Sequence, residues 1–348
     1  MPLEGRVMIS GSVVFYKIAT TCLLIFVGFL ARRMKLLPEI SVSVLSKYIM
    51  YFALPAYIVY YMPSTVSMET LSTNWFFPLV GVAVFMVGDV FAYITAKLWA
   101  KPRDLATFRH LVGIPNWVFM ALAVCEPMFG GDGVRIVLLY NISMMFYFWS
   151  FGMSSYRVGG DRKKMLRQLF CNVQTLANVI GLIFALLLPF VRGMESMDSG
   201  ELSALPPYLG VVTPFWETIY LIGMTALPLS IFQVGLVLGE TDGENGTVAI
   251  RDDRALCLAV LLRLVVSPLM SIALLMLLCE LGVPLTMNEF VISAIIMAMP
   301  AAVLCITSAE VYGGNTVLAA RGVLWGTLAS LLTAPVVTWL AVWAYTFI

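Results

Sequence analysis

Charged side chains stand inside stretches of the sequence that are otherwise apolar. Asp89, Arg263 and Arg321 lie within such stretches, and Glu310 closes another. An ionisable group in a membrane is costly unless it is paired or lines a water-filled cavity, so each of these residues is a functional candidate. We expect Asp89 to pair with Arg263, and Glu310 with Arg321 across the loop between them. Asp89, Arg263 and Glu310 are the candidates for coupling to an ion.

Two of these residues have a second interpretation of comparable weight. Asp89 is either a proton-responsive carboxylate coupled to ligand movement or one half of a fixed ion pair. Arg321 is either an anchor for an anionic ligand, because guanidinium matches a carboxylate with two hydrogen bonds, or a side chain that reaches back to the membrane surface.

Two prolines mark a different kind of candidate site. Pro300 stands in the middle of "AIIMAMPAAVLCITSAEVYGG" (294–314), and Pro115 stands in "GIPNWVFMAL" (113–122). Proline lacks the amide hydrogen and clashes with the preceding turn, so each helix should kink or break there. The freed amides at a helix start favour an anion, and freed carbonyls favour a cation or a proton donor. Two crossed breaks therefore predict a ligand site that needs no charged side chain.

Polar and small residues near these breaks complete the candidate site. Asn116 is the leading ligand contact because it adjoins the break and its amide both donates and accepts; the alternative is that it pairs with freed backbone. Asn141 and Gln233 lie at mid-span and are equally suited to a helix–helix hydrogen bond. The remaining candidates shape the site or offer backbone to it: Pro115, Met299, Pro300, Ala301 and Ala302.

These residues must be positioned by membrane helices. The chain has 348 residues, of which 61% are hydrophobic and 12% charged, whereas soluble domains carry about 25% charged residues. A span needs about 20 apolar residues, and such segments run almost end to end. We predict an all-α polytopic membrane protein with ten spans, near residues 10–31, 37–62, 75–98, 106–129, 134–156, 169–191, 214–238, 255–279, 288–310 and 316–346.

Several classes of function are excluded by composition. The single histidine, His110, and six scattered cysteines without a CxxC pair give no metal site, and no cofactor is implied. A formal charge of +1 gives no reason to expect nucleic acid as a partner. The chain lacks a G-x-x-x-x-G-K-[ST] loop for ATP. The mid-span residues offer no nucleophile–base pair, so we do not expect an enzyme.

The basic residues predict an orientation. Loops after odd-numbered spans contain or adjoin most of them, whereas even-numbered loops contain Arg192, with Arg135 at a span edge. By the positive-inside rule the odd loops are cytoplasmic, which places both termini on the non-cytoplasmic side. The basic residues of the odd loops are Arg32, Arg33, Lys35, Lys101, Arg103, Arg157, Arg162, Lys163, Lys164, Arg167, Arg251 and Arg254.

The ten spans divide into two halves of five with opposite topology, residues 1–168 and 169–348. "FALPAYIV" in span 2 has a counterpart, "TALPLSIF", in span 7, and the proline of span 4 has one in span 9. Matched Gly/Pro interruptions in two halves are the best sequence pointer to a transporter site. The alternative is that these prolines only kink their helices and mark no site.

"AMPAAVLCITSAEVYGGNTVLAARGVLWGTLASLLTAPVVTWL" resembles the last two spans of the auxin efflux carrier family, and "RRMKLLPEISVSVLSKYIMYFALPAYIV" resembles its second span. The resemblance covers nearly the whole chain. It implies two inverted five-helix repeats, a scaffold from spans 1, 2, 6 and 7, and a transport unit from spans 3–5 and 8–10. It also implies crossed broken helices in spans 4 and 9, an elevator-like motion and often homodimers.

Span 4 departs from the family pattern, which has an asparagine followed shortly by "GIP". Here Met120, Ala121 and Leu122 stand where a proline turn is expected. The break is therefore expected either at Gly113–Pro115 or nearer Ala121.

The sequence thus predicts a secondary transporter of a small organic anion in the cytoplasmic (inner) membrane of a bacterium. The resemblance makes a mono- or dicarboxylate, or an aromatic carboxylate, the leading substrate class. The driving force would be a proton gradient or the membrane potential. A sodium-coupled carrier of the related crossed-helix type and a non-transporting membrane sensor are the alternatives.

Overall fold

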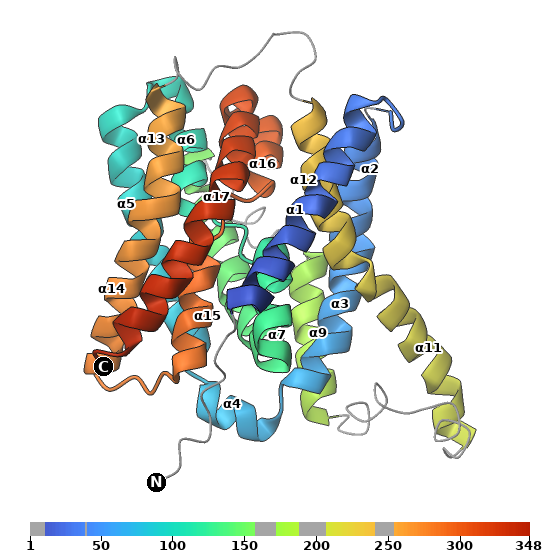
Figure 1. Cartoon of the computed structure of the whole chain (residues 1–348). Helices are drawn as coiled ribbons and strands as arrows, with labels where there is room; N and C mark the ends of the chain where they lie inside the picture. Colours follow the sequence, from blue (N-terminus) through green and yellow to red (C-terminus); the bar gives the residue numbers. More distant parts are fainter. Residues whose placement is uncertain (1–10, 39, 157–171, 188–206, 241–253) are drawn as a thin grey trace.

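The computed structural model is built of helices (Figure 1). It describes residues 11–38, 40–156, 172–187, 207–240 and 254–348. Two π-helices, η1 (Ile49–Ala53) and η6 (Leu262–Val266), and two 3-10 helices, η2 (Pro102–Asp104) and η3 (Gly152–Tyr156), interrupt or join the α-helices. The α-helices are α1 (Gly11–Arg33), α2 (Ile40–Tyr48), α3 (Leu54–Thr65), α4 (Met68–Asn74), α5 (Phe77–Trp99), α6 (Leu105–Gly113), α7 (Phe119–Ser150), α9 (Val173–Leu187), α11 (Pro207–Met224), α12 (Ala226–Glu240), α13 (Arg254–Leu261), α14 (Ser267–Glu280), α15 (Met287–Ala298), α16 (Leu304–Tyr312) and α17 (Thr316–Tyr345).

Four helical segments within the described residues are long and apolar enough to cross a membrane: Phe77–Trp99, Thr213–Leu236, Arg254–Glu280 and Thr316–Tyr345. Predicted span 1 coincides with α1, and each of the other predicted spans coincides with a shorter helix, with helices separated by a break or a π-helix, or with part of α7. The chain is thus an all-helical polytopic membrane protein, and the number of ten spans stays a prediction.

Proline and glycine divide the longer segments. Pro55 and Pro268 each stand two residues after the end of a π-helix, because a proline cannot supply the amide for a regular i→i−4 bond. In α7, Gly130 adopts a positive φ of 57° and separates the residues of predicted spans 4 and 5.

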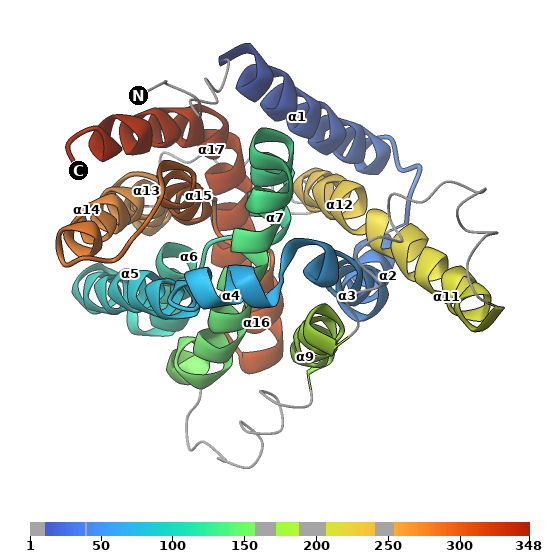
Figure 2. The ribbon, with the colours of Figure 1, turned by 90° about the horizontal axis from the view of Figure 1, so that it is seen from below.

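The helices pack in two groups. In the first group α1 lies along α12, and α3 lies against α9 and α11; in the second, α5 packs on α6 and α14, and α17 on α15 and α16. Helix α7 packs on α5 and α15 and completes the second group, and it also contacts α1, α3 and α12 of the first group (Figure 2). The first group contains the helices of predicted spans 1, 2, 6 and 7.

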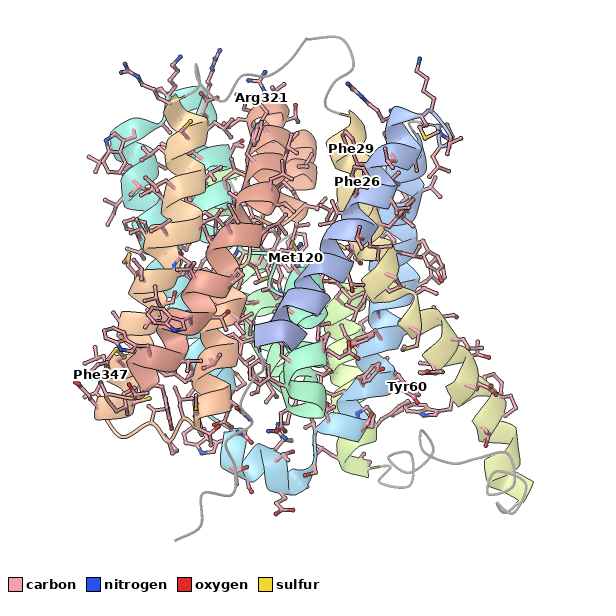
Figure 3. The ribbon with its side chains drawn as sticks, viewed as in Figure 1. Phe26, Phe29, Tyr60, Met120, Arg321 and Phe347 are labelled. Atoms are coloured by element: carbon pink, nitrogen blue, oxygen red, sulfur yellow. The ribbon has the colours of Figure 1, made fainter. Side chains whose placement is uncertain are left out.

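Apolar side chains fill the interior and also cover the outer surface. The second group holds most of the large fully buried side chains, including Phe85, Phe108, Tyr140 and Phe290. Phe26 and Phe347, by contrast, are 52% and 64% exposed, and Phe347 stands at the edge of the bundle in Figure 3. An apolar exterior of this kind matches lipid rather than water.

Glycines allow α1 and α12 to approach closely. A Cβ added at Gly28 would lie 2.2 Å from the Phe232 carbonyl oxygen, and one added at Gly235 would lie 2.0 Å from the Ile25 carbonyl oxygen. Small residues commonly allow membrane helices to approach with their backbones in contact. The contact between these helices is therefore incompatible with larger residues at both positions.

Replacing Gly235 by alanine is expected to destabilise the protein by about 1–3 kcal/mol, because the new methyl group forces two backbones apart. The matched control is Gly131→Ala, whose methyl group would meet its nearest neighbour, Thr65 Cγ2, at 3.9 Å. Unfolding of the purified protein in detergent measures both variants. Equal stability of the two variants would contradict the close contact between α1 and α12.

Candidate functional site

Two helix breaks meet inside the second helix group. Helix α6 ends at Gly113 and α7 begins at Phe119; α15 ends at Ala298 and α16 begins at Leu304. Between them, Pro115 and Ala301 form an isolated antiparallel bridge. The span 4 break therefore lies directly after Gly113, at the first of the two positions expected, and Ala121 is helical.

The bridge pairs backbone groups that the breaks leave free. The Asn116 amide donates to the Pro300 carbonyl at 2.7 Å, and the Ala302 amide donates to the Ile114 carbonyl at 3.2 Å. The residues before the two prolines, Ile114 and Met299, are extended, as the clash with a following proline ring demands. Each proline thus ends a half-helix, and the two extended segments form hydrogen bonds with each other.

The two half-helices that begin at the breaks have N-cap residues that do not cap them. Val118 and Val303 stand at the N-cap positions of α7 and α16, with no side-chain cap and no acidic residue in either first turn. Oδ1 of Asn116 accepts a long hydrogen bond, 3.5 Å, from the Met120 amide. Nδ2 of Asn116 makes no hydrogen bond within the described part of the chain. Free amides and this Nδ2 are donors with which an anion could be bound.

Arg263 stands at the two half-helices that end at the breaks. Its Nη1 donates to the Val112 carbonyl at 3.0 Å and its Nε to the Met299 carbonyl at 3.2 Å, while Nη2 donates to the Met297 carbonyl. The side chain is almost fully buried, at 1% exposure. These carbonyls belong to the last turns of α6 and α15 and to the residue after α15, so one guanidinium serves both helix ends.

The partners of Arg263 differ from the sequence expectation. They are backbone carbonyls and not Asp89, and two of them lie just before the residues of the bridge between the two breaks. The residue lies on η6, a π-turn, which shifts the direction of side chains relative to a regular helix.

Most of the sequence matches a known family. Residues 13–161 and 161–338 fit the family described as "Membrane transport protein". The chain belongs to this family, the auxin efflux carriers. It is therefore a membrane transporter. No curated protein matches it in a sequence search.

In this auxin efflux carrier family member Asp89 pairs with Arg109 of α6, a residue that the sequence reasoning did not single out. Nε of Arg109 donates to Asp89 Oδ1 at 2.7 Å, its Nη2 donates to Oδ2, and the Tyr147 hydroxyl donates to Oδ2 at 2.8 Å. Asp89 is 1% exposed and Arg109 7%. The expected Asp89–Arg263 pair is therefore wrong, and Asp89 ties α5 to α6 and α7 of the transporter.

Two mid-span amides of the transporter make helix–helix hydrogen bonds. Asn141 accepts from Trp117 Nε1 at 3.0 Å and donates to Asn178 of α9 at 3.3 Å, which links Trp117, two residues after Pro115, to the first helix group. Gln233 donates to Ser46 of α2, within the first group. Asn141 thus contacts the crossing through the side chain of Trp117, whereas Gln233 takes part in the packing of α12 against α2.

Arg321 lies near the end of the bundle where α17 starts (Figure 3). Its Nε and Nε1 of Trp325, four residues on, are buried without a hydrogen-bond partner within the described residues. Helix α16 includes Glu310, but its side chain lies outside the described part, so the expected Glu310–Arg321 pair stays a prediction.

One further membrane carboxylate escaped the sequence reasoning. Glu126 follows the break by about two turns in α7, and its Oε2 accepts a hydrogen bond from the Tyr57 hydroxyl of α3 at 3.2 Å. The signal was present, since an acidic residue inside a predicted span is a candidate by the rule applied to Asp89. This contact joins the two helix groups.

Proposed function

We propose that the chain is a secondary transporter of a small organic anion, a mono- or dicarboxylate or an aromatic carboxylate, that binds where the two broken helices cross. One observation carries the proposal: Arg263 satisfies the carbonyl ends of α6 and α15, while the starts of α7 and α16 have no acidic residue, and the side-chain bond to an amide there within the described residues is the long one from Met120 to Asn116. The unsatisfied groups at the crossing are therefore donors with positive partial charge, which favour an anion.

Few side chains are needed to hold such a substrate. Asn116 would donate from Nδ2, and the half-helix starts would donate backbone amides. Ala301 and Ala302 are small and allow a carboxylate to approach the backbone. Pro115 and Pro300 shape the site, and Met299 has its carbonyl occupied by Arg263.

An elevator-like motion would carry the crossing past the first helix group. The contact between the groups includes an apolar cluster in which Ile25, Ile231 and Val234 pack with Ala123 of α7, and Val303 adjoins it. Apolar contacts are non-directional, so such a surface can slide with little change in free energy. The hydrogen bonds Tyr57–Glu126 and Asn141–Asn178 also cross between the groups and would have to break or exchange during the motion.

The second group would be the transport unit and the first the scaffold, in the cytoplasmic membrane with both termini outside. Basic residues at the end of α1, in η2 and at the start of α13 support this orientation by the positive-inside rule. A proton gradient or the membrane potential would drive the cycle. A sodium-coupled carrier is the alternative, in which sodium would be coordinated by carbonyls at the crossing other than those that Arg263 occupies.

Ligand-dependent thermal stabilisation of the purified protein in detergent tests the proposal. A ligand that binds only the folded state raises the melting temperature by mass action. We expect a saturable rise with at least one of a panel of mono-, di- and aromatic carboxylates, and none with the matching amines. A rise with amines alone would contradict an anion site.

A further inference from the structure

Arg263 is a buried charge compensated by backbone alone. Among the described residues the ion pairs are Arg103–Asp104, Arg109–Asp89 and Arg135–Asp132, and none includes Arg263. A lone arginine inside a membrane bundle is costly, so its three carbonyl partners must supply the compensation. An apolar residue of similar volume would fill the same space without this cost.

The carbonyls that compensate the charge of Arg263 come from the C-terminal ends of two helices. The C-terminal end of a helix carries about half a negative charge, and the ends of α6 and α15 both direct carbonyls to this guanidinium. One arginine therefore offsets both ends. In crossed-helix carriers such carbonyls are the groups that hold a coupled sodium ion or proton. The guanidinium of Arg263, which is part of the chain, lies where such a cation would bind.

We propose that Arg263 is a built-in counter-cation, which replaces a coupled metal cation at the crossing and makes anion binding there independent of sodium. The inference rests on the proposed function, since it concerns the ion requirement of the same site. Arginine stays charged in proteins, so the positive charge remains in place through the whole cycle. The bound anion would be the exchangeable charge at the crossing, and Arg263 would be a positioning residue that keeps the half-helix ends together.

Two variants separate charge from simple bracing. Arg263→Lys keeps the charge but has a single ammonium in place of the fork, so it reaches fewer carbonyls. Arg263→Gln removes the charge but retains an amide that donates to one or two carbonyls. If Arg263 only holds the two helix ends together, Arg263→Gln should be as stable and as active as Arg263→Lys. If Arg263 is a counter-cation, only Arg263→Lys should retain stability and uptake.

The first measurement needs no substrate. The melting temperature of the wild type in detergent is expected to be equal in sodium and choline chloride of the same ionic strength. Arg263→Gln is expected to melt several degrees below Arg263→Lys in choline. A saturable stabilisation of the wild type by sodium, or equal melting of the two variants, would overturn the proposal.

The second measurement is anion uptake into proteoliposomes. Wild-type uptake should be unchanged when choline replaces sodium, and Arg263→Lys should retain sodium-independent uptake at a reduced rate. Uptake by Arg263→Gln should fall at least about tenfold, the change that corresponds to loss of one charge-assisted interaction. Sodium-dependent wild-type uptake would overturn the proposal. Absence of anion uptake by the wild type, with the melting results as expected, would instead contradict the proposed function and leave the counter-cation standing.

Discussion

Replacing Asn116 by alanine is expected to reduce anion uptake about ten- to a hundredfold while leaving the fold intact. Nδ2 of Asn116 makes no hydrogen bond within the described residues, and its Oδ1 makes only the long contact with the Met120 amide. Truncation therefore removes little packing or bonding from the folded protein. A hydrogen bond from this amide to a bound carboxylate is worth about 1.5–3 kcal/mol, which corresponds to the expected loss of uptake.

Uptake at substrate concentrations below saturation, together with the melting temperature, measures this effect. Ser143→Ala is the matched control: Ser143 is buried in α7, which follows Asn116, and within the described residues its hydroxyl bonds only to the Tyr140 carbonyl one turn back. The control should transport at the wild-type rate. Full uptake by a folded Asn116→Ala protein would show that the side chain does not contact the substrate.

Removing the carboxylate of Asp89 is expected to cost about 3–5 kcal/mol of folding stability. Asp89→Ala leaves the guanidinium of Arg109 buried without its counter-charge, and loss of one partner of a buried ion pair has this magnitude. The double variant Asp89→Asn/Arg109→Gln removes both charges and should recover a large part of the loss. Unfolding in detergent compares the three proteins.

Asp132→Asn is the matched control for charge removal. Asp132 also pairs with an arginine, Arg135, at 2.9 Å, but its side chain is 52% exposed. Exposed ion pairs contribute about 0–1 kcal/mol, so this variant should remain near the wild type. A loss with Asp132→Asn as large as that with Asp89→Ala would contradict the importance of burial.

The double variant also separates the two roles considered for Asp89. A fixed pair that only joins α5 to α6 predicts that the double variant, if stable, transports with the wild-type pH dependence. A proton-responsive carboxylate predicts that the pH dependence disappears. The enclosure of Asp89 by Arg109 and Tyr147 favours the fixed pair, and we expect the pH dependence to persist.

The helix breaks were predictable from the sequence because proline acts locally. Pro115 and Pro300 lack an amide and exclude helical geometry from the preceding residue, so the breaks follow from two residues each. The backbone bridge between them was not predictable from either segment alone. It requires the two spans to cross at one depth, which depends on the packing of the whole second group.

The partners of the charged residues were harder to predict from the sequence. Asp89 and Arg263 lie in spans that were expected to be repeat partners, but proximity in space also depends on rotation about each helix axis. The π-turn at η6 changes that rotation, and the sequence signals it only through Pro268. Arg109 was overlooked because it lies near a span boundary, where a basic residue is ordinarily interfacial.

Charge movement by the purified protein in proteoliposomes on a solid-supported membrane tests the central claim most directly. The panel comprises mono-, di- and aromatic carboxylates and their amine counterparts, each with and without sodium and at two pH values. We predict saturable currents for at least one carboxylate, unchanged by sodium and reduced by Asn116→Ala. Currents that amines alone evoke, or carboxylate currents that require sodium or are unaffected by Asn116→Ala, would contradict an anion site with a built-in counter-cation at the crossed helices.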